Sequence, residues 1–242
     1  MVDAIPFFNS LPEDINFKIA SLLQVRDLCA LSCCSKFWRQ LCFSDSIWHH
    51  LLTIRWPLLH ISPLSPTNLK TWRRLYFERH VDVGLRTGSV ERFMKACSRN
   101  ESLEVDDYLQ AFEIVNSAKF GFEDIQRFLF KPEINVLVNL LGVHYCIANL
   151  GISGDNLVQV LRTCEISNRH VCVKWWKLGR WIHGFRGRDE LLFRWISLED
   201  LAAEEDETVL GVLRRGTVLE VLRVQISAVD HKSIPWSYQD NQ

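Results

Sequence analysis

The sequence predicts an α+β protein: a small helical module at the N-terminus, a further helical segment, and a strand-rich C-terminal segment. Apolar residues recur at helical spacing between Ile15 and Leu23 and again between Ser89 and about Arg162. From about Asn168 apolar and polar residues alternate, which is typical of strands. The expected organisation is a module over 10–56, a helical extension and linker over 57–84, and a mixed α+β domain over 85–242.

The N-terminal module is predicted to contain four short helices. Ser10 is a good N-cap for the first, Pro12 suits its first turn, and Glu13 and Asp14 lie where the helix dipole favours negative charge. The apolar face of this helix consists of Ile15, Ile19, Leu22 and Leu23. The second helix is expected to contain Val25, Leu28 and Leu31. The third follows a cap at Ser35 and contains Phe37, Trp38 and Leu41. The fourth follows Ser44 or Asp45 and contains Ile47, Trp48, Leu51 and Leu52.

These four helices carry more large apolar side chains than a module of this size can hide. Domains of under about 50 residues are only marginally stable on their own, because their elements share little mutual surface. Trp38 and Leu41 are expected to be internal, whereas a self-contained bundle has no need of the Leu11–Pro12 start. Part of the apolar surface is therefore expected to bind a partner, unless the helices form an ordinary core.

The order and spacing of these residues resemble the F-box. The matching segments are Leu11-Pro12-x-Asp14-Ile15, Leu22-Leu23, Val25-Arg26-Asp27-Leu28, Ser35-Lys36-x-Trp38-Arg39-x-Leu41 and Ser44-Asp45-Ser46-Ile47-Trp48. One departure is the Cys33–Cys34 pair, where many family members have a valine, and cysteine packs there as a small hydrophobe.

The resemblance implies a function as a non-catalytic subunit of an SCF-type (Skp, cullin, F-box) E3 ubiquitin ligase. An F-box docks on a Skp-type adaptor, which bridges to cullin and RING subunits, and the rest of the chain presents a protein substrate for ubiquitination. The adaptor-binding positions implied here are Leu11, Pro12, Ile15, Ile19, Leu22, Leu23, Val25 and Leu28. The repeats of known substrate-binding parts of the family are absent from the sequence, so the substrate is not identified.

Composition adds few constraints on partners. The formal net charge of -1 gives no general attraction to nucleic acid or to anionic membranes. The N-terminus lacks the basic and apolar regions of a secretory signal, so we expect an intracellular protein of the nucleus or cytoplasm. The eight cysteines form no CxxC pair, which favours buried free thiols over a zinc site. The zinc site considered would combine Cys29 and Cys33 with His49 and His50. No cofactor is expected.

The segment after the module is expected to contain a helix that packs back on it. Thr67 is a candidate cap, and Leu69, Trp72 and Tyr76 form an apolar stripe. The surrounding lysine and arginine residues then form a solvated face, although the same helix could be read as a nucleic-acid element. Similar Trp-x-x-Leu-Tyr segments follow the F-box in plant members of the family, and this resemblance favours a plant origin.

An uncharged run between Ile134 and Gly154 could suggest a membrane span. Asn135, Asn139 and Asn149 interrupt it and no aromatic or basic belt flanks it, so a buried central helix is the better interpretation.

The C-terminal segment is expected to contain two hairpins and a short acidic helix. Strand 171–176 turns at Leu178–Gly179 into 181–185, and Ser197 with Asp200 forms a capping box for a helix through Glu207. A second hairpin joins 208–213 to 217–226, of which the later part could equally be helical.

Basic and aromatic residues are interleaved along the first hairpin. Such residues can grip phosphates and stack bases, so a nucleic-acid-binding module is the alternative function; tryptophan and arginine also anchor protein interfaces. A third interpretation is a half-buried sheet whose cations pair with the acids of 199–207. The candidate substrate-binding residues are Trp175, Trp176, Trp181, Arg180 and Phe185.

Catalysis by this chain is not expected. The sequence has no GxSxG elbow, Walker lysine, HExxH motif or dinucleotide fingerprint. His170 or His183 with Cys172 could be posed as a nucleophile and base, but no third group to orient them is evident.

Overall fold

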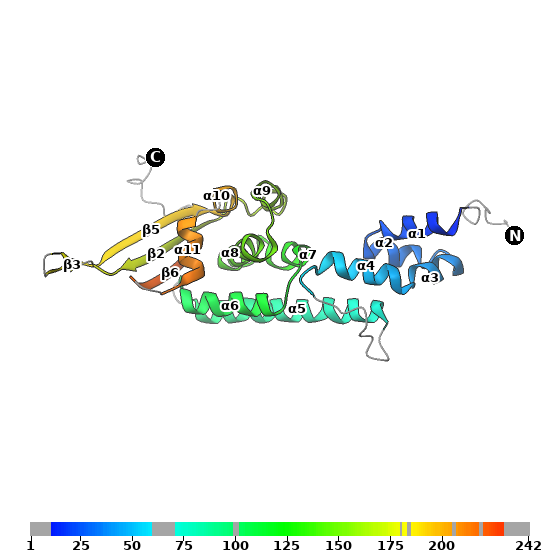
Figure 1. Ribbon diagram of the computed structural model, residues 1–242, viewed down its shortest axis with the longest axis horizontal. Coiled ribbons are helices and arrows are strands. Elements are labelled where there is room, and N and C mark those ends of the chain that lie inside the picture. Colours follow the sequence, from blue (N-terminus) through cyan, green and yellow to red (C-terminus); the bar gives the residue numbers. More distant parts are fainter. Residues whose placement is uncertain are drawn as a thin grey trace. The chain divides into compact units, whose positions relative to one another are not determined.

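The computed structural model describes residues 11–59, 71–98, 102–179, 181–182, 185–204, 207–217 and 220–229. The chain divides into two compact units, Met1–Asp82 and Val83–Gln242. The model combines helices in both units with antiparallel strands in the second, as the α+β prediction requires (Figure 1).

The first unit contains four short helices and the beginning of a fifth. They are α1 (Glu13–Ser21), α2 (Val25–Leu31), α3 (Lys36–Cys42), α4 (Asp45–Arg55) and α5 (Trp72–Cys97), the last of which continues into the second unit. The core of the first unit is formed by Leu28, Ile47, Trp48, Leu52, Trp56 and Tyr76. The four helices predicted for 10–56 are thus confirmed, because each has a start signal and an apolar face within its own few residues.

The helix starts agree with the sequence in part. The Ser35 hydroxyl accepts a hydrogen bond from the Trp38 backbone N–H at 3.2 Å, as expected of an N-cap. Pro12 occupies the N-cap position of α1, one residue before the expected first turn, and Ser10 lies outside the described residues. Asp45 Oδ1 accepts from the Trp72 backbone N–H at 3.2 Å, so this carboxylate tethers the start of α5.

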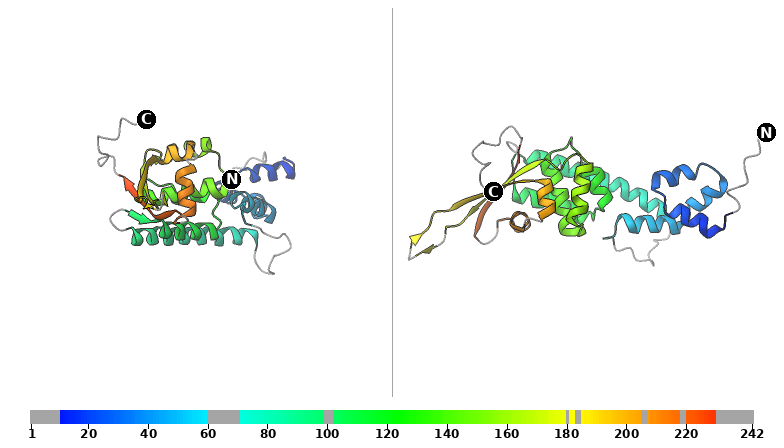
Figure 2. Two further views of the ribbon diagram at one scale, coloured as in Figure 1. Left: turned by 60° about the vertical axis from the view of Figure 1, so that its left-hand side comes forward. Right: turned by 90° about the horizontal axis from the view of Figure 1, so that it is seen from above.

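The second unit is built on a four-stranded antiparallel sheet of order β1-β6-β2-β5. Its strands are β1 (Ser102–Glu104), β2 (His170–Lys177), β5 (Glu190–Ser197) and β6 (Val221–Val229). The β2–β5 ribbon runs out to the two-stranded β3 (Trp181–Ile182) and β4 (Phe185–Arg186), as the right-hand view of Figure 2 shows.

Helices cover one face of this sheet. Val171 and Val173 of β2 and Val224 and Ile226 of β6 are buried on that face, and α6 (Val105–Ser117) and α8 (Val136–Tyr145) contact these strands. The remaining helical elements of the unit are α7 (Phe122–Asp124), the π-helical turns η2 (Ile125–Leu129) and η3 (Cys146–Leu150), α9 (Gly154–Thr163), α10 (Leu198–Glu204) and α11 (Glu207–Arg215).

The uncharged run forms the centre of the second unit. Every residue of α8 is buried, which confirms the prediction of a buried central helix. Asn139 is satisfied there, because its Nδ2 donates to the carbonyl oxygens of Leu129, at 2.6 Å, and Lys131, at 3.2 Å. Within the described ranges, no helix has the length and apolar character needed to cross a membrane.

Two sequence-based expectations for the C-terminal segment are wrong. Leu178–Gly179 is not the turn of the first hairpin, because β2 pairs along its whole length with β5 and the chain turns only beyond β3. Segment 208–213 belongs to α11 rather than to a strand, since Val209, Leu210 and Leu213 are buried at helical spacing. The later segment does form a strand, and it pairs with β1 and β2.

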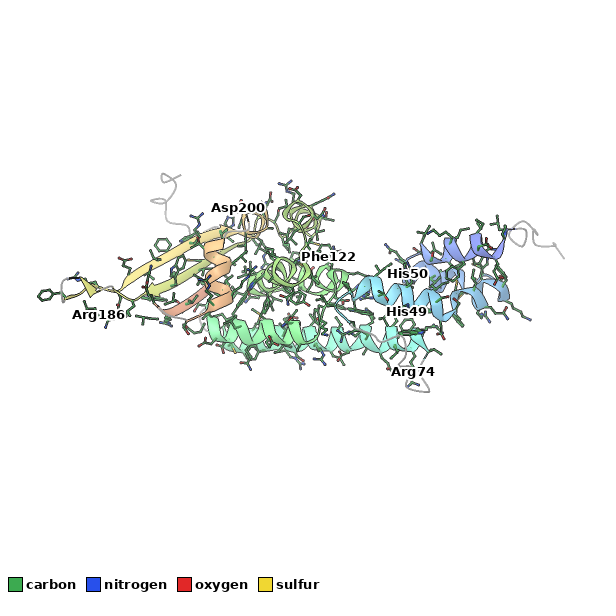
Figure 3. The ribbon with its side chains drawn as sticks, in the orientation of Figure 1. His49, His50, Arg74, Phe122, Arg186 and Asp200 are labelled. Carbon is green, nitrogen blue, oxygen red and sulfur yellow. The ribbon has the colours of Figure 1, made fainter. Side chains whose placement is uncertain are left out.

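Ser197 caps the acidic helix as predicted, although Asp200 pairs with its hydroxyl rather than with its backbone N–H as in a full capping box. Ser197 Oγ accepts from the Asp200 backbone N–H at 3.0 Å and donates to Asp200 Oδ2 at 2.6 Å (Figure 3 labels Asp200). The helix ends at Glu204, short of the predicted Glu207, where α11 begins.

Candidate functional site

The apolar side chains of α1 point outward from the first unit. Leu22 is 73% exposed and Ile15 46%, and Leu11 and Ile19 are also exposed. The residues of α1 that pack inward are instead Asn16 and Ala20, both almost completely buried. A helix of a self-contained bundle shows the opposite arrangement, with its large apolar stripe in the core.

The other predicted adaptor-binding residues differ in exposure. Pro12 is exposed, whereas Leu23 and Val25 are half-buried at the junction of α1 and α2. Leu28 is fully buried in the core of the unit, so its side chain does not contribute to the surface. The exposed and half-buried members, Leu11, Pro12, Ile15, Ile19, Leu22, Leu23 and Val25, are called the α1 surface below.

Two further exposed apolar residues were not predicted from the sequence to belong to a binding surface. Phe37 of α3 and Phe43, which follows α3, are both exposed. Phe37 is next to the buried Trp38, and neighbours on a helix point about 100° apart, so only one of the two can be internal. That spacing could have identified Phe37 from the sequence.

The cysteines of the first unit are less buried than expected. Cys33 and Cys34 are exposed and Cys29 is half-buried, whereas Cys42 is buried. The prediction of buried thiols is therefore wrong for Cys33 and Cys34, which lie in the short turn between α2 and α3. All eight cysteines lie within the described ranges and none forms a disulfide, and the same ranges include no cluster suited to a metal ion.

The start of α5 packs on α4 through aromatic rings and arginines. Tyr76 is buried between Trp48 and Trp56, with ring centroids 5.4 Å and 5.1 Å away, which confirms the predicted docking through Tyr76. Thr67 and Leu69, the predicted cap and start of the stripe, lie outside the described residues. Arg55 is also buried, and its Nη1 donates to the Tyr76 hydroxyl at 2.6 Å. The guanidinium of Arg73 lies 4.1 Å from the Phe43 ring centroid, so this cation stacks on an aromatic ring rather than forming part of a solvated face.

Among the candidate substrate-binding residues whose side chains the structure describes, Trp175 and Trp176 lie on different faces of the sheet. Trp175 is buried on the helix-covered face of the sheet, whereas the adjacent Trp176 lies on the opposite face, where Arg223 stacks 5.1 Å from its ring centroid. Phe185 is 81% exposed in β4, beside the labelled Arg186 of Figure 3. Trp181 belongs to β3, and Arg180 lies outside the described residues.

The strand register identifies neighbours that the sequence did not. Leu191, Phe193 and Trp195 of β5 lie opposite Trp176, Lys174 and Cys172 of β2, and therefore on the face of the sheet opposite Val171 and Val173. Leu191 and Phe193 are exposed, and Trp195 is half-buried. These residues were missed because the partner of β2 was assigned to 181–185.

Three cations of β2, β4 and β6 pair with acids close to them. Arg186 bonds to Asp189 at 2.9 Å, Lys177 Nζ lies 3.5 Å from Glu220, and Arg223 pairs with Glu104 of β1. Glu199, which the sequence offered as a partner of these cations, instead pairs with Arg162 of α9, and this pairing lowers the pKa of its carboxyl. The predicted pairing with the acids of 199–207 is therefore wrong for Lys177 and Arg186, which pair with Glu220 and Asp189 instead.

The candidate pair of Cys172 and His170 is not arranged for nucleophilic attack. Burial raises the pKa of the Cys172 thiol, and His170 Nδ1 lies 2.8 Å from the Asn168 carbonyl oxygen, so this pair lacks the thiolate that attack requires. His183 lies outside the described residues. His144 is buried beside Tyr108, and burial lowers its pKa to about 3, which keeps the ring neutral.

Comparison with known proteins identifies the N-terminal module. Residues 8–53 match the F-box-like family, so the chain carries an F-box-like domain there. A stretch of 45 residues is 42% identical to the F-box/WD repeat-containing protein pof1 of Schizosaccharomyces pombe, which is 19% of this chain and 7% of that protein. No solved structure matches the chain.

Proposed function

We propose that this chain, through the F-box-like domain at 8–53, is the substrate-recognition subunit of an SCF-type E3 ubiquitin ligase inside the cell. The α1 surface binds a Skp-type adaptor, and the second unit presents a protein substrate. The observation that carries this proposal is the orientation of α1, whose large apolar side chains face outward while Asn16 and Ala20 face the core.

The α1 surface has the features of a binding site for another protein. Contiguous exposed apolar patches are uncommon on monomeric proteins and mark interaction surfaces. Interfaces of standard size bury roughly 1,600 Å² in total, and a few central side chains supply most of their binding energy. Leu22, which is 73% exposed, and its neighbours Ile15 and Ile19 are the anchors that we expect here.

In this role the chain contributes proximity rather than chemistry. The cullin-bound RING subunit and its conjugating enzyme supply the activated thioester, and the receptor holds a substrate lysine near it. A bound nucleophile has a far higher effective concentration than a free one, so the bimolecular step becomes effectively local.

The test is adaptor affinity, measured by isothermal titration with a purified Skp-type adaptor. The triple variant Ile15→Ala, Ile19→Ala, Leu22→Ala removes exposed side chains, so it is expected to fold and to bind about a hundredfold more weakly or worse. Ile54→Ala is the matched control, because Ile54 of α4 is 63% exposed and lies outside the α1 surface. The proposal would be refuted if the wild type does not bind the adaptor, or if the triple variant binds it with wild-type affinity.

Nucleic-acid binding by the hairpin, the alternative that the sequence offers, has less support. Trp175 is buried under the helices, and Arg186, Lys177 and Arg223 are already paired with carboxylates. Binding of a labelled single-stranded oligonucleotide with a steep salt dependence, lost in Phe185→Ala, would favour this alternative over the ligase proposal.

A further inference from the structure

One cation of the first unit lies against aromatic rings and has no acid beside it. The Arg73 guanidinium of α5 stacks 4.1 Å from the Phe43 ring centroid and lies 5.6 Å from that of Phe77. Among the described residues, no carboxylate pairs with Arg73 and no group forms a hydrogen bond with its side chain. Its Nε is buried, whereas its Nη1 and Nη2 remain accessible to solvent. Because stacking removes part of the water around a cation, an acceptor at the two Nη atoms would offset that loss.

Two acids on the adjoining helices are bonded to other groups. Asp45 of α4 accepts a hydrogen bond from the backbone N–H of Trp72. Glu78 of α5 pairs with Arg74, which Figure 3 labels. The charge of Arg73 is therefore not neutralised within the part of this unit that the structure describes, and an acid from another molecule is the group that this position lacks.

Exposed apolar side chains continue from Arg73 along α5. Phe77 and Val81 follow it at four-residue steps, which places all three on one ridge of the helix. Val81 is 59% exposed, Phe43 42% and Phe77 38%. Trp48 is buried, and its ring centroid lies 5.3 Å from that of Phe77, so a core residue holds this ring in place. The four accessible residues are called the Arg73 surface below: Phe43, Arg73, Phe77 and Val81.

We propose that the Arg73 surface docks a partner protein other than the adaptor, through a segment in which a carboxylate is flanked by apolar side chains. The carboxylate bonds to both Nη atoms of Arg73, because two parallel N–H···O bonds are the favoured pairing of a guanidinium with an acid. The apolar side chains of the segment cover Phe77 and Val81. Arginine and aromatic residues together are typical of the side chains that supply most of the binding energy at protein interfaces.

Charge and composition select this partner. A nucleic-acid strand is bound by several unpaired cations, but the adjacent Arg74 is already paired with Glu78, so a single carboxylate fits better than a row of phosphates. The adaptor is expected at the α1 surface, whose members are all uncharged and include none of the Arg73 surface. A surface that presents a cation therefore fits a different, acidic segment.

The experiment is a fluorescence anisotropy titration of the full chain with two labelled, capped tetrapeptides. The first consists of aspartate, leucine, phenylalanine and leucine, and the second has asparagine in place of the aspartate. An extended tetrapeptide spans roughly 13 Å, and Arg73 and Val81 are about 12 Å apart along the helix axis, so one peptide reaches both. The acidic peptide is expected to bind saturably, and the neutral one about tenfold more weakly.

Three variants assign the binding to the Arg73 surface. Arg73→Met removes the charge but retains a side chain that packs on Phe43, so the affinity for the acidic peptide should fall about tenfold, to that of the neutral one. Val81→Ala should weaken both peptides alike. Arg74→Met is the matched control, because it removes an adjacent cation that is already paired, and it should bind as the wild type does. Circular dichroism and thermal unfolding establish that each variant is folded.

Several outcomes would overturn the proposal. Absence of saturable binding of the acidic peptide, or equal binding of the two peptides, would show that the surface does not recognise a carboxylate. Undiminished binding by Arg73→Met would show that this cation serves only to pack α5 on Phe43. Displacement of the peptide by saturating adaptor would assign the surface to the adaptor, and tighter binding of a labelled single-stranded oligonucleotide would assign it to nucleic acid. The α1 triple variant should bind the acidic peptide as the wild type does, so this test and the test of the ligase proposal fail independently.

Discussion

Asn16 Nδ2 donates a hydrogen bond to the backbone carbonyl oxygen of Leu11 at 3.1 Å, linking the core side of α1 to the chain that leads into it. Asn16 is buried, whereas Leu11 is exposed and belongs to the α1 surface. The bond therefore positions an interaction residue from within the core. It also explains why a polar residue occupies the inward face of a helix whose apolar side chains point outward.

Substitution of Asn16 should separate adaptor binding from folding. Asn16→Ala removes the bond to Leu11 and also the buried Oδ1, which has no partner, so the free energy of unfolding should fall by only about 1 kcal/mol. Adaptor affinity should fall several-fold, because Leu11 is no longer held in place. Asn16→Asp instead buries a carboxylate and should cost about 3 kcal/mol or more. Urea denaturation with adaptor titration checks both; equal stability of the two variants would contradict this account.

Arg55 and Tyr76 should be energetically coupled. The Arg55 guanidinium donates to the Tyr76 hydroxyl at 2.6 Å, lies 3.0 Å from His80 Nδ1 and stacks 4.7 Å from the Trp56 ring centroid. Arg55→Met should lower the free energy of unfolding by about 3 kcal/mol, since it removes the charged hydrogen bond to Tyr76 and the stacking on Trp56, and Tyr76→Phe should lower it by about 1 kcal/mol. A double-mutant cycle should give a coupling of about 1 kcal/mol. Additive effects of the two changes would show that the bond does not stabilise the unit.

The sequence predicted the short helices well because their signals are local. Ser35 and Ser197 each cap a helix through atoms within three residues, and the stripe that buries Tyr76 lies within one helix. Prediction from the sequence failed where a strand pairs with a segment that is distant along the chain. The strand opposite Trp176 begins at Glu190, beyond the intervening β3 and β4, and no local pattern specifies that pairing. Segment 208–213 fits both the period of a strand and that of a helix, and tertiary packing decided between them.

The candidate site was predictable only through resemblance. Periodicity identifies the apolar stripe of Ile15, Ile19 and Leu22, but a stripe normally marks the side that faces the core. Only the structure shows that Asn16 and Ala20 take the inward side. The separation of Trp175 and Trp176 onto opposite faces follows from strand alternation, yet the choice of face depended on where the helices pack.

Stability should depend on pH through His144. Its Nδ1 lies 3.1 Å from the Tyr108 hydroxyl, its Nε2 is buried without a hydrogen bond, and burial together with the nearby Arg214 lowers its pKa from 6.5 to about 3. The unfolded chain therefore binds a proton that the folded chain does not, and stability falls as the pH drops from 6.5 towards 3, by up to about 1.4 kcal/mol per pH unit. The measurement is urea denaturation at pH 7 and pH 5.

His144→Gln provides the control for that pH dependence. The variant keeps a polar group near Tyr108 but cannot titrate, and the other seven histidines are common to both proteins. The difference between wild type and variant in free energy of unfolding should therefore shrink as the pH falls. A difference that is constant across this range would show that His144 is not buried in the neutral form.

Two glycines of the second unit should respond oppositely to alanine. A Cβ at Gly142 of α8 would lie 2.8 Å from the Phe130 ring and 3.1 Å from Ile125 Cγ2, so Gly142→Ala should destabilise by about 1–3 kcal/mol through overpacking. A Cβ at Gly211 of α11 meets nothing within 4 Å, so Gly211→Ala should stabilise by about 0.5–1 kcal/mol, because alanine has the higher helix propensity. Thermal unfolding of both variants tests the pair. If Gly142→Ala were as stable as Gly211→Ala, an added methyl group would fit between α8 and η2. The two elements would then pack less closely than the structure shows.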